Sequence, residues 1–221
     1  MQIAIDGPAG VGKSTLAKAL AETLGYIYLD TGAMYRGVAY IADKSGIAPE
    51  NITALQKILD NLDLHFEIID GKKSLFNQNE NIEEFIREAK ISNIVSQYAK
   101  VDIVRKAMTQ QQQAIAKKNS VVMDGRDIGT VILPKAEYKF FLVASPEERT
   151  KRRLLELQEK GVEISFDELL NDIKKRDEED ANRAIAPLKK AEDAIIINTD
   201  HLNQKEVLEK ILDIIKNNVW Q

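Results

Sequence analysis

The sequence predicts an α/β fold in which a five-stranded parallel sheet is flanked by helices. Five short apolar segments have the length of strands, and most are continuous runs, which is typical of parallel strands buried on both faces. Segments with the apolar spacing of amphipathic helices lie between them, and strands that alternate with helices indicate a parallel sheet. The predicted strands are Gln2–Asp6, Tyr26–Leu29, Val121–Asp124, Tyr138–Ala144 and Ala194–Asn198.

Apolar periodicity and start signals place the predicted helices. Apolar residues recur at helical spacing in Leu16–Leu24, Ile52–Leu62 and Val207–Ile215. Three positions carry a capping residue with an acid three residues later, which is the pattern that begins a helix. These pairs are Ser145 with Glu148, Ser165 with Glu168, and Asn203 with Glu206.

One region interrupts the alternation of strands and helices. His65–Ile69 and Lys73–Phe76 flank Asp70-Gly71-Lys72, and Asp-Gly between such runs is a strong hairpin signal. We therefore expect a small antiparallel β insert at about residues 62–80, followed by a polar helix at about residues 82–90.

Two polar stretches are expected at the surface. The charged stretch Glu147–Lys175 forms a second appendage to the core, with a bend at Gly161. The low-complexity run Gln110–Gln113 is expected to be the solvated face of a helix.

Composition excludes several classes of protein. The chain has 221 residues, no cysteine, and 31 Lys and Arg against 35 Asp and Glu, which gives a net charge of −4. The missing cysteines exclude a disulfide scaffold, a zinc–thiolate site and a thiol nucleophile. The acidic balance argues against broad nucleic-acid binding, so no nucleic-acid partner is expected. The apolar runs are too short to cross a bilayer and the chain enters a strand at once, so we expect no membrane partner, no signal peptide and a cytoplasmic protein.

A phosphate-binding loop joins the first strand to the first helix. Gly7-Pro8-Ala9-Gly10-Val11-Gly12-Lys13-Ser14 matches G-x-x-x-x-G-K-[ST] in full, with a strand before it and a helix after it. Glycines let backbone N–H groups turn inward around phosphate oxygens, and the helix N-terminus favours negative charge. Lys13 is expected to reach the β- and γ-phosphates, and the Ser14 hydroxyl to ligate Mg²⁺. The residues assigned to ATP are Gly7, Pro8, Ala9, Gly10, Val11, Gly12, Lys13, Ser14 and Thr15.

This loop identifies a nucleoside-triphosphate site and leaves the reaction open. GTPases need a guanine-reading Asn-Lys-x-Asp segment, which this sequence lacks. Motor and helicase ATPases are usually larger and need an output surface. A small P-loop kinase remains, provided that the sequence also contains an acceptor site.

Several further segments resemble bacterial cytidylate kinase. They cover nearly the whole chain in the order of that family. The segments are Gly7–Thr15, Leu29–Arg36, Arg105, Asp124–Thr130, Arg149–Gly161 and Arg176–Leu188. The resemblance implies a nucleoside-monophosphate kinase that moves the γ-phosphoryl group of ATP, with Mg²⁺, onto CMP or dCMP. Members of that family are usually monomeric, so a monomer is expected.

The resemblance also implies a division of the chain into functional parts. The P-loop core comprises residues 1–35, 96–147 and 176–221. Residues 36–95 form the monophosphate-binding domain, which contains the β insert at about residues 62–80. Residues 148–175 form a mobile helical lid.

Arginine is concentrated in these segments. Eight of the nine arginines lie in them and only Arg87 lies outside, whereas the 22 lysines are scattered along the chain. The guanidinium group is a rigid, always-charged fork that suits phosphates better than the flexible ammonium group of lysine. A site that holds the phosphate groups of two nucleotides close together would require such a concentration of arginine.

The acceptor site is expected to read phosphate, sugar and base separately. The resemblance assigns Arg36, Arg126 and Arg183 to the phosphate, Arg176 and Asp180 to the sugar, and Asp127, Arg105, Thr31 and Ser96 to the base. Cytosine has a donor at N4 and acceptors at N3 and O2, so Asp127 supplies an acceptor and Arg105 a donor. Arg176, Asp180 and Arg183 are spaced i, i+4 and i+7 and are expected to share one helix face.

Catalysis is expected to consist of positioning and charge neutralisation. The acceptor phosphate is largely dianionic at neutral pH, so no general base is needed. The groups expected to offset repulsion between the two anions are Lys13, Arg126, Arg149, Arg153 and Arg183, together with Mg²⁺. Arg149, Arg152 and Arg153 fit a lid over ATP, and Asp124 at a strand end fits a magnesium-site acid that acts through water.

Two other readings stay open. One is a P-loop kinase for another small acceptor, such as UMP, dTMP, shikimate or dephospho-coenzyme A. The Asp127 and Arg105 pair and the Asp180–Arg183 segment argue against it. The other is an NTP-dependent, RNA-associated switch, which the negative charge disfavours.

Overall fold

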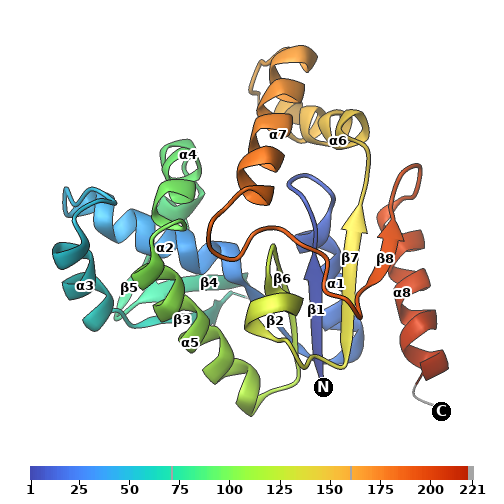
Figure 1. The fold of residues 1–221 in the computed structure, drawn as a ribbon, viewed down its shortest axis with the longest axis horizontal. Helices are drawn as coiled ribbons and strands as arrows, with labels where there is room; N and C mark the ends of the chain where they lie inside the picture. Colours follow the sequence, from blue (N-terminus) through green and yellow to red (C-terminus); the bar gives the residue numbers. More distant parts are fainter. Residues whose placement is uncertain (71, 160, 219–221) are drawn as a thin grey trace. The chain divides into compact units, whose positions relative to one another are not determined.

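The computed structural model describes residues 1–70, 72–159 and 161–218, which form two compact units. The first unit contains Met1–Leu29 and everything described from Ala116 onward, and the second is Asp30–Ile115. A five-stranded parallel sheet forms the centre of the first unit and confirms the predicted fold class (Figure 1). Its strands are β1 (Gln2–Asp6), β2 (Ile27–Asp30), β6 (Val121–Gly125), β7 (Tyr138–Val143) and β8 (Ile195–Asn198).

The strand order explains where a site can form. The order is β2-β6-β1-β7-β8, so β1 lies between β6 and β7. Ile5 pairs with Asp124 and Asp6 with Gly125 in parallel register. Since parallel strands end at one edge of a sheet, Asp124 lies beside the point where β1 leads into the phosphate-binding loop.

The first unit also contains helices. They are α1 (Lys13–Leu24), α6 (Pro146–Glu159), α7 (Phe166–Ala181), α8 (Gln204–Asn218) and a π-helical turn, η2 (Ile128–Ile132). Of these, α6 and α7 project beyond the end of the sheet (Figure 1). The three predicted start signals are confirmed by side-chain caps. Ser145 Oγ accepts from the Glu148 N–H at 3.3 Å, Ser165 Oγ from that of Glu168 at 3.2 Å, and Asn203 Oδ1 from that of Glu206 at 3.0 Å.

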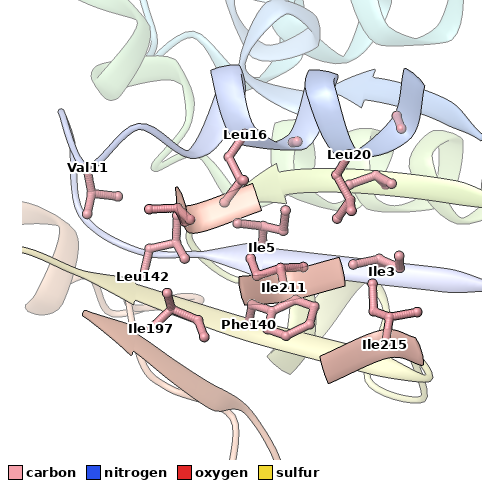
Figure 2. Close-up of a cluster of buried hydrophobic side chains, with 14 residues drawn as sticks. Ile3, Ile5, Val11, Leu16, Leu20, Phe140, Leu142, Ile197, Ile211 and Ile215 are labelled. Carbon is pink, nitrogen blue, oxygen red and sulfur yellow. The ribbon is translucent and has the colours of Figure 1, made fainter. Parts of the chain in front are cut away.

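An apolar core fixes α1 and α8 on the sheet (Figure 2). Ile3 and Ile5 of β1 meet Leu16 and Leu20 of α1 and Ile211 of α8, and all five side chains are buried. Each such burial contributes about 1.5–3 kcal/mol relative to exposure. The N-terminus of α1 is thereby held at the carboxyl edge of the sheet.

The second unit contains helices and a small sheet. The helices are α2 (Thr31–Lys44), α3 (Ile52–Asp60), α4 (Ala89–Tyr98), most of α5 (Asp102–Lys118) and a 3₁₀ turn, η1 (Phe85–Arg87). The antiparallel sheet has the order β3-β4-β5, with strands β3 (Leu64–Ile69), β4 (Lys72–Asn77) and β5 (Glu80–Asn81). It confirms the predicted β insert. Ile69 pairs with Lys72, as the predicted hairpin requires, and Gly71 of its turn lies outside the described residues.

The prediction of a polar helix at about residues 82–90 is wrong, because only the short 3₁₀ turn η1 (Phe85–Arg87) forms before α4. The Ile82 N–H donates to the Leu75 carbonyl at 2.9 Å, so this segment first continues the pairing of the sheet. Glu88 is extended, and α4 begins only at Ala89. Pairing with β4 therefore decides the conformation here, and the polar periodicity does not.

The prediction that Gln110–Gln113 form a solvated helix face is also wrong in part. Gln110 is exposed, but Gln112 is fully buried on α5. Val104 and Met108 are buried at the same four-residue spacing, so Gln112 continues the inward face of the helix.

The charged appendage is formed by α6 and α7, which pack against each other. Gly161 between them has φ 72°, a left-handed conformation that glycine adopts without strain. The boundary expected at residues 175/176 lies within α7, so Arg176 and Asp180 continue the second helix of the lid segment. No helix among the described residues is both long and apolar enough to cross a membrane.

Candidate active site

The phosphate-binding loop is formed by Gly7–Ser14, between β1 and α1. Gly7 has φ 152°, and a Cβ atom there would lie 2.5 Å from the Leu142 carbonyl oxygen of β7. No side chain fits that approach, so the glycine is required by packing as well as by backbone conformation. Gly12 caps α1 with φ 91°. The loop therefore leads its backbone N–H groups into the helix N-terminus, where anions bind.

Lys13 is buried within this loop and bonded to it. Its Nζ donates to the Pro8 carbonyl at 2.7 Å. Burial, followed by repulsion from Arg126, holds the pKa of Lys13 well below its usual value, although Asp124, Asp6 and Asp180 act in the opposite direction. A phosphate would give this ammonium group the anionic partner that the Pro8 carbonyl does not supply.

A pair of oxygen ligands lies beside Lys13. Ser14 Oγ donates to Asp124 Oδ2 at 2.7 Å, and the Tyr28 hydroxyl donates to Asp124 Oδ1 at 2.9 Å. Asp124 is buried at the end of β6. A hydroxyl and a carboxylate fit Mg²⁺, which prefers oxygen ligands and usually keeps several waters beside one or two carboxylates and substrate phosphates. The two residues predicted for the metal are thus brought together.

Asp6 joins the loop to the segment that carries Asp127. Its carboxylate is buried and accepts from the Ile128 N–H at 2.8 Å and the Gly129 N–H at 2.7 Å. Burial raises the pKa of Asp6 to about 6, with repulsion from Asp127 adding to it and the two N–H bonds and Lys13 opposing it. Asp127 is itself buried immediately before η2.

Arg149 links the lid segment to the phosphate-binding loop. Its guanidinium group is buried and donates to the Ala9 carbonyl at 2.9 Å and the Ala144 carbonyl at 3.2 Å. It also pairs with both carboxylate oxygens of Asp177 on α7, at 3.1 and 2.5 Å. Of the lid arginines, this one therefore lies against the loop that is expected to hold the phosphates.

The other two lid arginines differ in their surroundings. Arg152 donates to the Thr199 carbonyl at 2.6 Å and pairs with Glu148, so it ties α6 to the end of β8. Arg153 is 44% exposed and pairs with Glu156 on its own helix at 2.8 Å. Arg153 is more available to a ligand than Arg152, whose guanidinium group is bonded to the backbone.

Asp180 lies at the centre of an arginine cluster. Arg126 Nε donates to its Oδ2 at 2.6 Å, and Arg183 donates to its Oδ1. Burial alone would raise the pKa of Asp180, but Arg126 and Arg183, with help from Arg176, hold it below its usual value. Burial and repulsion from Arg126 lower the pKa of Arg176. The cluster concentrates positive charge around one carboxylate.

The expectation that Arg183 shares a helix face with Arg176 and Asp180 is wrong. Helix α7 ends at Ala181, so Arg183 lies beyond it. The Leu188 N–H turns back to the Asp180 carbonyl at 2.8 Å, and Pro187 cannot extend a helix. Arg183 nevertheless reaches Asp180 from the loop.

The second unit holds the remaining predicted acceptor residues. Thr31 is buried at the start of α2, and Ser96 is half-buried on α4. Arg105 is buried on α5, donates to the Ala99 carbonyl at 3.2 Å and lies over the Tyr35 ring at 5.6 Å. Arg36 pairs with Asp30, the N-cap residue of α2.

Sequence reasoning missed the residues that hold these groups in place. They are Asp6, Tyr28, Asp30, Arg87 and Asp177. Asp6 ends an apolar strand directly before the phosphate-binding loop, which is a signal that could have been used. Asp30 and Asp177 lie within the segments Leu29–Arg36 and Arg176–Leu188, which already carried the family resemblance. Tyr28 and Arg87 carry no such signal, because their partners are far away in the sequence.

Comparison with known proteins agrees with this geometry. The cytidylate kinase family model matches residues 3–217. A cytidylate kinase of Caldicellulosiruptor bescii is 47% identical over 223 residues, covering 99% of each chain. A cytidylate kinase of Clostridium botulinum strain Langeland is 48% identical over 220 residues, covering 98% of each.

Among solved structures, an uncharacterized protein from Eubacterium ventriosum has a similar fold. Its TM-score is 0.53 at 17% identity, with 98% of each chain covered, so this likeness concerns the fold alone. The family match and the sequence relatives both extend over nearly the entire chain. The chain belongs to the cytidylate kinase family.

Proposed function

We propose that this protein transfers the γ-phosphoryl group of ATP to CMP and dCMP, forming CDP and dCDP. The observation that carries the proposal is the complete phosphate-binding loop with Lys13 inside it and the Ser14–Asp124 pair beside it. Membership of the cytidylate kinase family supports the choice of acceptor.

On the donor side, residues of the first unit would bind ATP. The N–H groups of Gly7–Ser14 would surround the phosphates, and Lys13 would exchange the Pro8 carbonyl for the β- and γ-phosphate oxygens. Ser14 would bind Mg²⁺ directly and Asp124 through water. When bound, Mg²⁺ neutralises charge on the β- and γ-phosphates. Arg149, against Ala9, and Arg153 would add positive charge from α6.

On the acceptor side, each group would read one part of the nucleotide. We assign Arg36, Arg126 and Arg183 to the phosphate, Arg176 and Asp180 to the sugar, and Asp127, Arg105, Thr31 and Ser96 to the base. Asp180 already binds Arg126 and Arg183, so these guanidinium groups are pre-oriented by a carboxylate.

The transfer itself needs no general base. The acceptor phosphate has a second pKa near 6 and is largely dianionic at neutral pH, so it is a competent nucleophile. The protein must align the acceptor phosphate with the γ-phosphate of ATP and reduce the repulsion between these two anions. The cationic groups named above would do both.

The decisive experiment measures ADP formation from ATP with a panel of acceptors. CMP and dCMP should be used at least about 100-fold better than UMP or dTMP, because uracil and thymine present an oxygen to Asp127 where cytosine presents an amine. Equal use of UMP would overturn the assignment of the base site.

Two variants, assayed with the same panel of acceptors, test the roles of Lys13 and Asp127 separately. Lys13→Ala should fold normally and lose at least about 100-fold in turnover with every acceptor, since it removes charge from the transferred group. Asp127→Ala should weaken use of CMP far more than residual use of UMP. Retained turnover in the first variant would contradict the role of Lys13, and equal losses in the second would contradict the role of Asp127.

A further inference from the structure

A chain of polar contacts in the second unit ends on Arg36. Arg36 Nη2 lies 3.4 Å from Asp30 Oδ2, and Asp30 Oδ1 accepts from the Ala33 N–H at 2.7 Å. Asp30 therefore caps α2 and pairs with an arginine that α2 carries. The Asp30 carboxylate is therefore one group that orients the Arg36 guanidinium.

Arg87 joins Asp30 to a second carboxylate. Its Nη2 donates to Asp30 Oδ2 at 3.2 Å, and its Nε donates to Glu83 Oε1 at 2.8 Å. A planar guanidinium group can bridge two carboxylates in this way because its donors point in fixed directions. Arg87 is the arginine that lies outside every segment assigned to nucleotides.

Glu83 is in turn fixed to the small antiparallel sheet. Its Oε2 accepts from the Leu75 N–H of β4 at 3.0 Å, and the Ile82 N–H donates to the Leu75 carbonyl at 2.9 Å. Leu75 is fully buried. Glu83, a partner of Arg87, is thus anchored to strand β4 of the sheet.

Helix α2 is positioned against the same strand. Gly37 follows Arg36, and a Cβ atom there would lie 3.2 Å from side-chain atoms of both Leu64 and Leu75. Leu75 therefore positions two groups. Its side chain packs against the α2 backbone at Gly37, next to Arg36, and its N–H holds the Glu83 carboxylate, which pairs with Arg87. Two routes, one through Gly37 and one through Glu83 and Arg87, connect Leu75 of the sheet to the Arg36 guanidinium group.

The charges of this network leave it able to attract an anion. Asp30 and Glu83 pair with Arg36 and Arg87, and the Lys73 ammonium group adds positive charge that acts on both carboxylates. The carboxylates keep the cations apart from one another without cancelling all of their charge.

We propose that Arg87 is a positioning residue for Arg36, acting through Asp30, and that the antiparallel sheet β3-β4-β5 serves to hold this network. The inference rests on the proposed function, in which Arg36 binds the acceptor's phosphate. Arg87 is 51% exposed, and an exposed ion pair with no such role would affect stability slightly and acceptor binding not at all.

The test is Arg87→Met, with the KM of CMP, the KM of ATP and kcat measured separately. The KM of CMP should rise about 5–10-fold while the KM of ATP and kcat change less than about twofold, because the acceptor's phosphate meets a less ordered Arg36. Arg87→Lys should recover only part of the loss, since one ammonium group cannot bridge Asp30 and Glu83 as a guanidinium does.

Lys90→Met is the matched control. It removes another exposed ion pair of the second unit, Lys90 with Asp43 at 2.6 Å, and should leave every kinetic constant unchanged. Glu83→Gln tests the same chain from its other end and should raise the KM of CMP about 2–5-fold, even if Arg87→Met fails to fold. A loss in Arg87→Met no larger than in Lys90→Met would overturn the proposal.

Arg36→Met separates this inference from the proposed function. If Arg36→Met leaves the KM of CMP unchanged, the assigned role of Arg36 fails, and the inference fails with it. If Arg36→Met raises the KM of CMP, the double variant Arg36→Met/Arg87→Met should be no worse than Arg36→Met alone. Additive losses would show that Arg87 does not act through Arg36.

Discussion

Asp6 shows how one buried side chain can join two parts of the site. It stands at the end of β1, directly before the phosphate-binding loop, and accepts two backbone N–H groups from the turn that follows Asp127. A carboxylate in this position costs desolvation energy, which is why burial raises its pKa to about 6. These hydrogen bonds offset part of that cost, and they fix the phosphate-binding loop to the segment after Asp127, which is proposed to read the base.

Asp6→Asn should change how stability depends on pH. Because the pKa of Asp6 is about 6 in the folded protein and 3.8 ordinarily, the folded state binds this proton more tightly than the unfolded state. Asp6 therefore lowers the free energy of unfolding as pH rises from about 4 to about 6, by up to about 3 kcal/mol, with no further change above that range. Denaturant unfolding of both proteins between pH 4 and 8 measures the difference.

The difference in unfolding free energy, native minus Asp6→Asn, should fall across that interval and then stay level. A constant offset is also expected, because the amide replaces one acceptor oxygen with a donor facing an N–H group. Profiles that run parallel over the whole pH range would show that Asp6 does not titrate near pH 6.

Tyr28→Phe tests whether a hydroxyl outside the motifs orients the magnesium-site acid. Tyr28 donates to Asp124 Oδ1 while Ser14 donates to Oδ2. Losing the hydroxyl removes one hydrogen bond worth about 1 kcal/mol, so affinity for ATP with Mg²⁺ should fall about 3–10-fold. Affinity for ATP in EDTA should not change, and equilibrium binding under both conditions is the measurement.

Tyr138→Phe is the control for this prediction. Its hydroxyl also donates one hydrogen bond, to the Ile215 carbonyl at 3.1 Å, but it lies at the start of β7, away from the carboxyl edge of the sheet. It should lower stability slightly and leave both affinities unchanged. Equal losses with and without Mg²⁺ in Tyr28→Phe would mean that Tyr28 serves packing only.

At the scale of elements, α6 and α7 behave as one attachment to the loop. Arg149 of α6 binds Asp177 of α7, and the same guanidinium group binds the Ala9 carbonyl. The two helices bury Leu169 and Ile173, whereas Leu155 on α6 is 62% exposed. The buried Arg149 guanidinium thus connects the α6 and α7 pair to the phosphate-binding loop, an arrangement that fits the predicted lid.

Limited trypsin digestion should detect closure of this lid. Cleavage after Lys151, Arg152 and Arg153 should slow severalfold when a non-hydrolysable ATP analogue and CMP are both bound, because α6 is then held at more points. Cleavage after Lys57 of α3 serves as the internal reference. Unchanged cleavage within α6 in the presence of both ligands would argue against closure.

At the scale of the whole molecule, the proposed ligands differ in which unit they contact. All residues assigned to ATP belong to the first unit, whereas those assigned to CMP are divided over both. The net charge of −4 describes neither unit's binding residues, because the arginines are concentrated in a few segments.

Hydrogen exchange should reveal this division. The non-hydrolysable ATP analogue with Mg²⁺ should slow amide exchange around the phosphate-binding loop and α1 only. CMP should slow exchange in both units, at the start of α2 and along α7, since a ligand stabilises the segments that it contacts. Protection by CMP confined to one unit would contradict the proposed acceptor residues of the other.

The sequence alone determined the parallel sheet, the helix starts, the phosphate-binding loop and the β insert. These features depend on neighbours in the chain: continuous apolar runs, a capping residue three positions from an acid, and glycines beside Lys13. Local chemistry is enough to specify them, and the structure confirms the parallel sheet, the three capped helix starts and the β insert.

Only the tertiary structure decided which side chains hold the site in place. Asp6 and Ile128 are 122 positions apart, and Asp30 and Arg87 are 57 apart, so no local pattern connects them. The same reason explains the failed expectations. Pairing of Ile82 with β4 leaves only the 3₁₀ turn η1 before Ala89, and the chain turns back to Asp180 after α7 ends at Ala181, before Arg183. Long-range hydrogen bonds and packing set these details, and they exist only once the chain has folded.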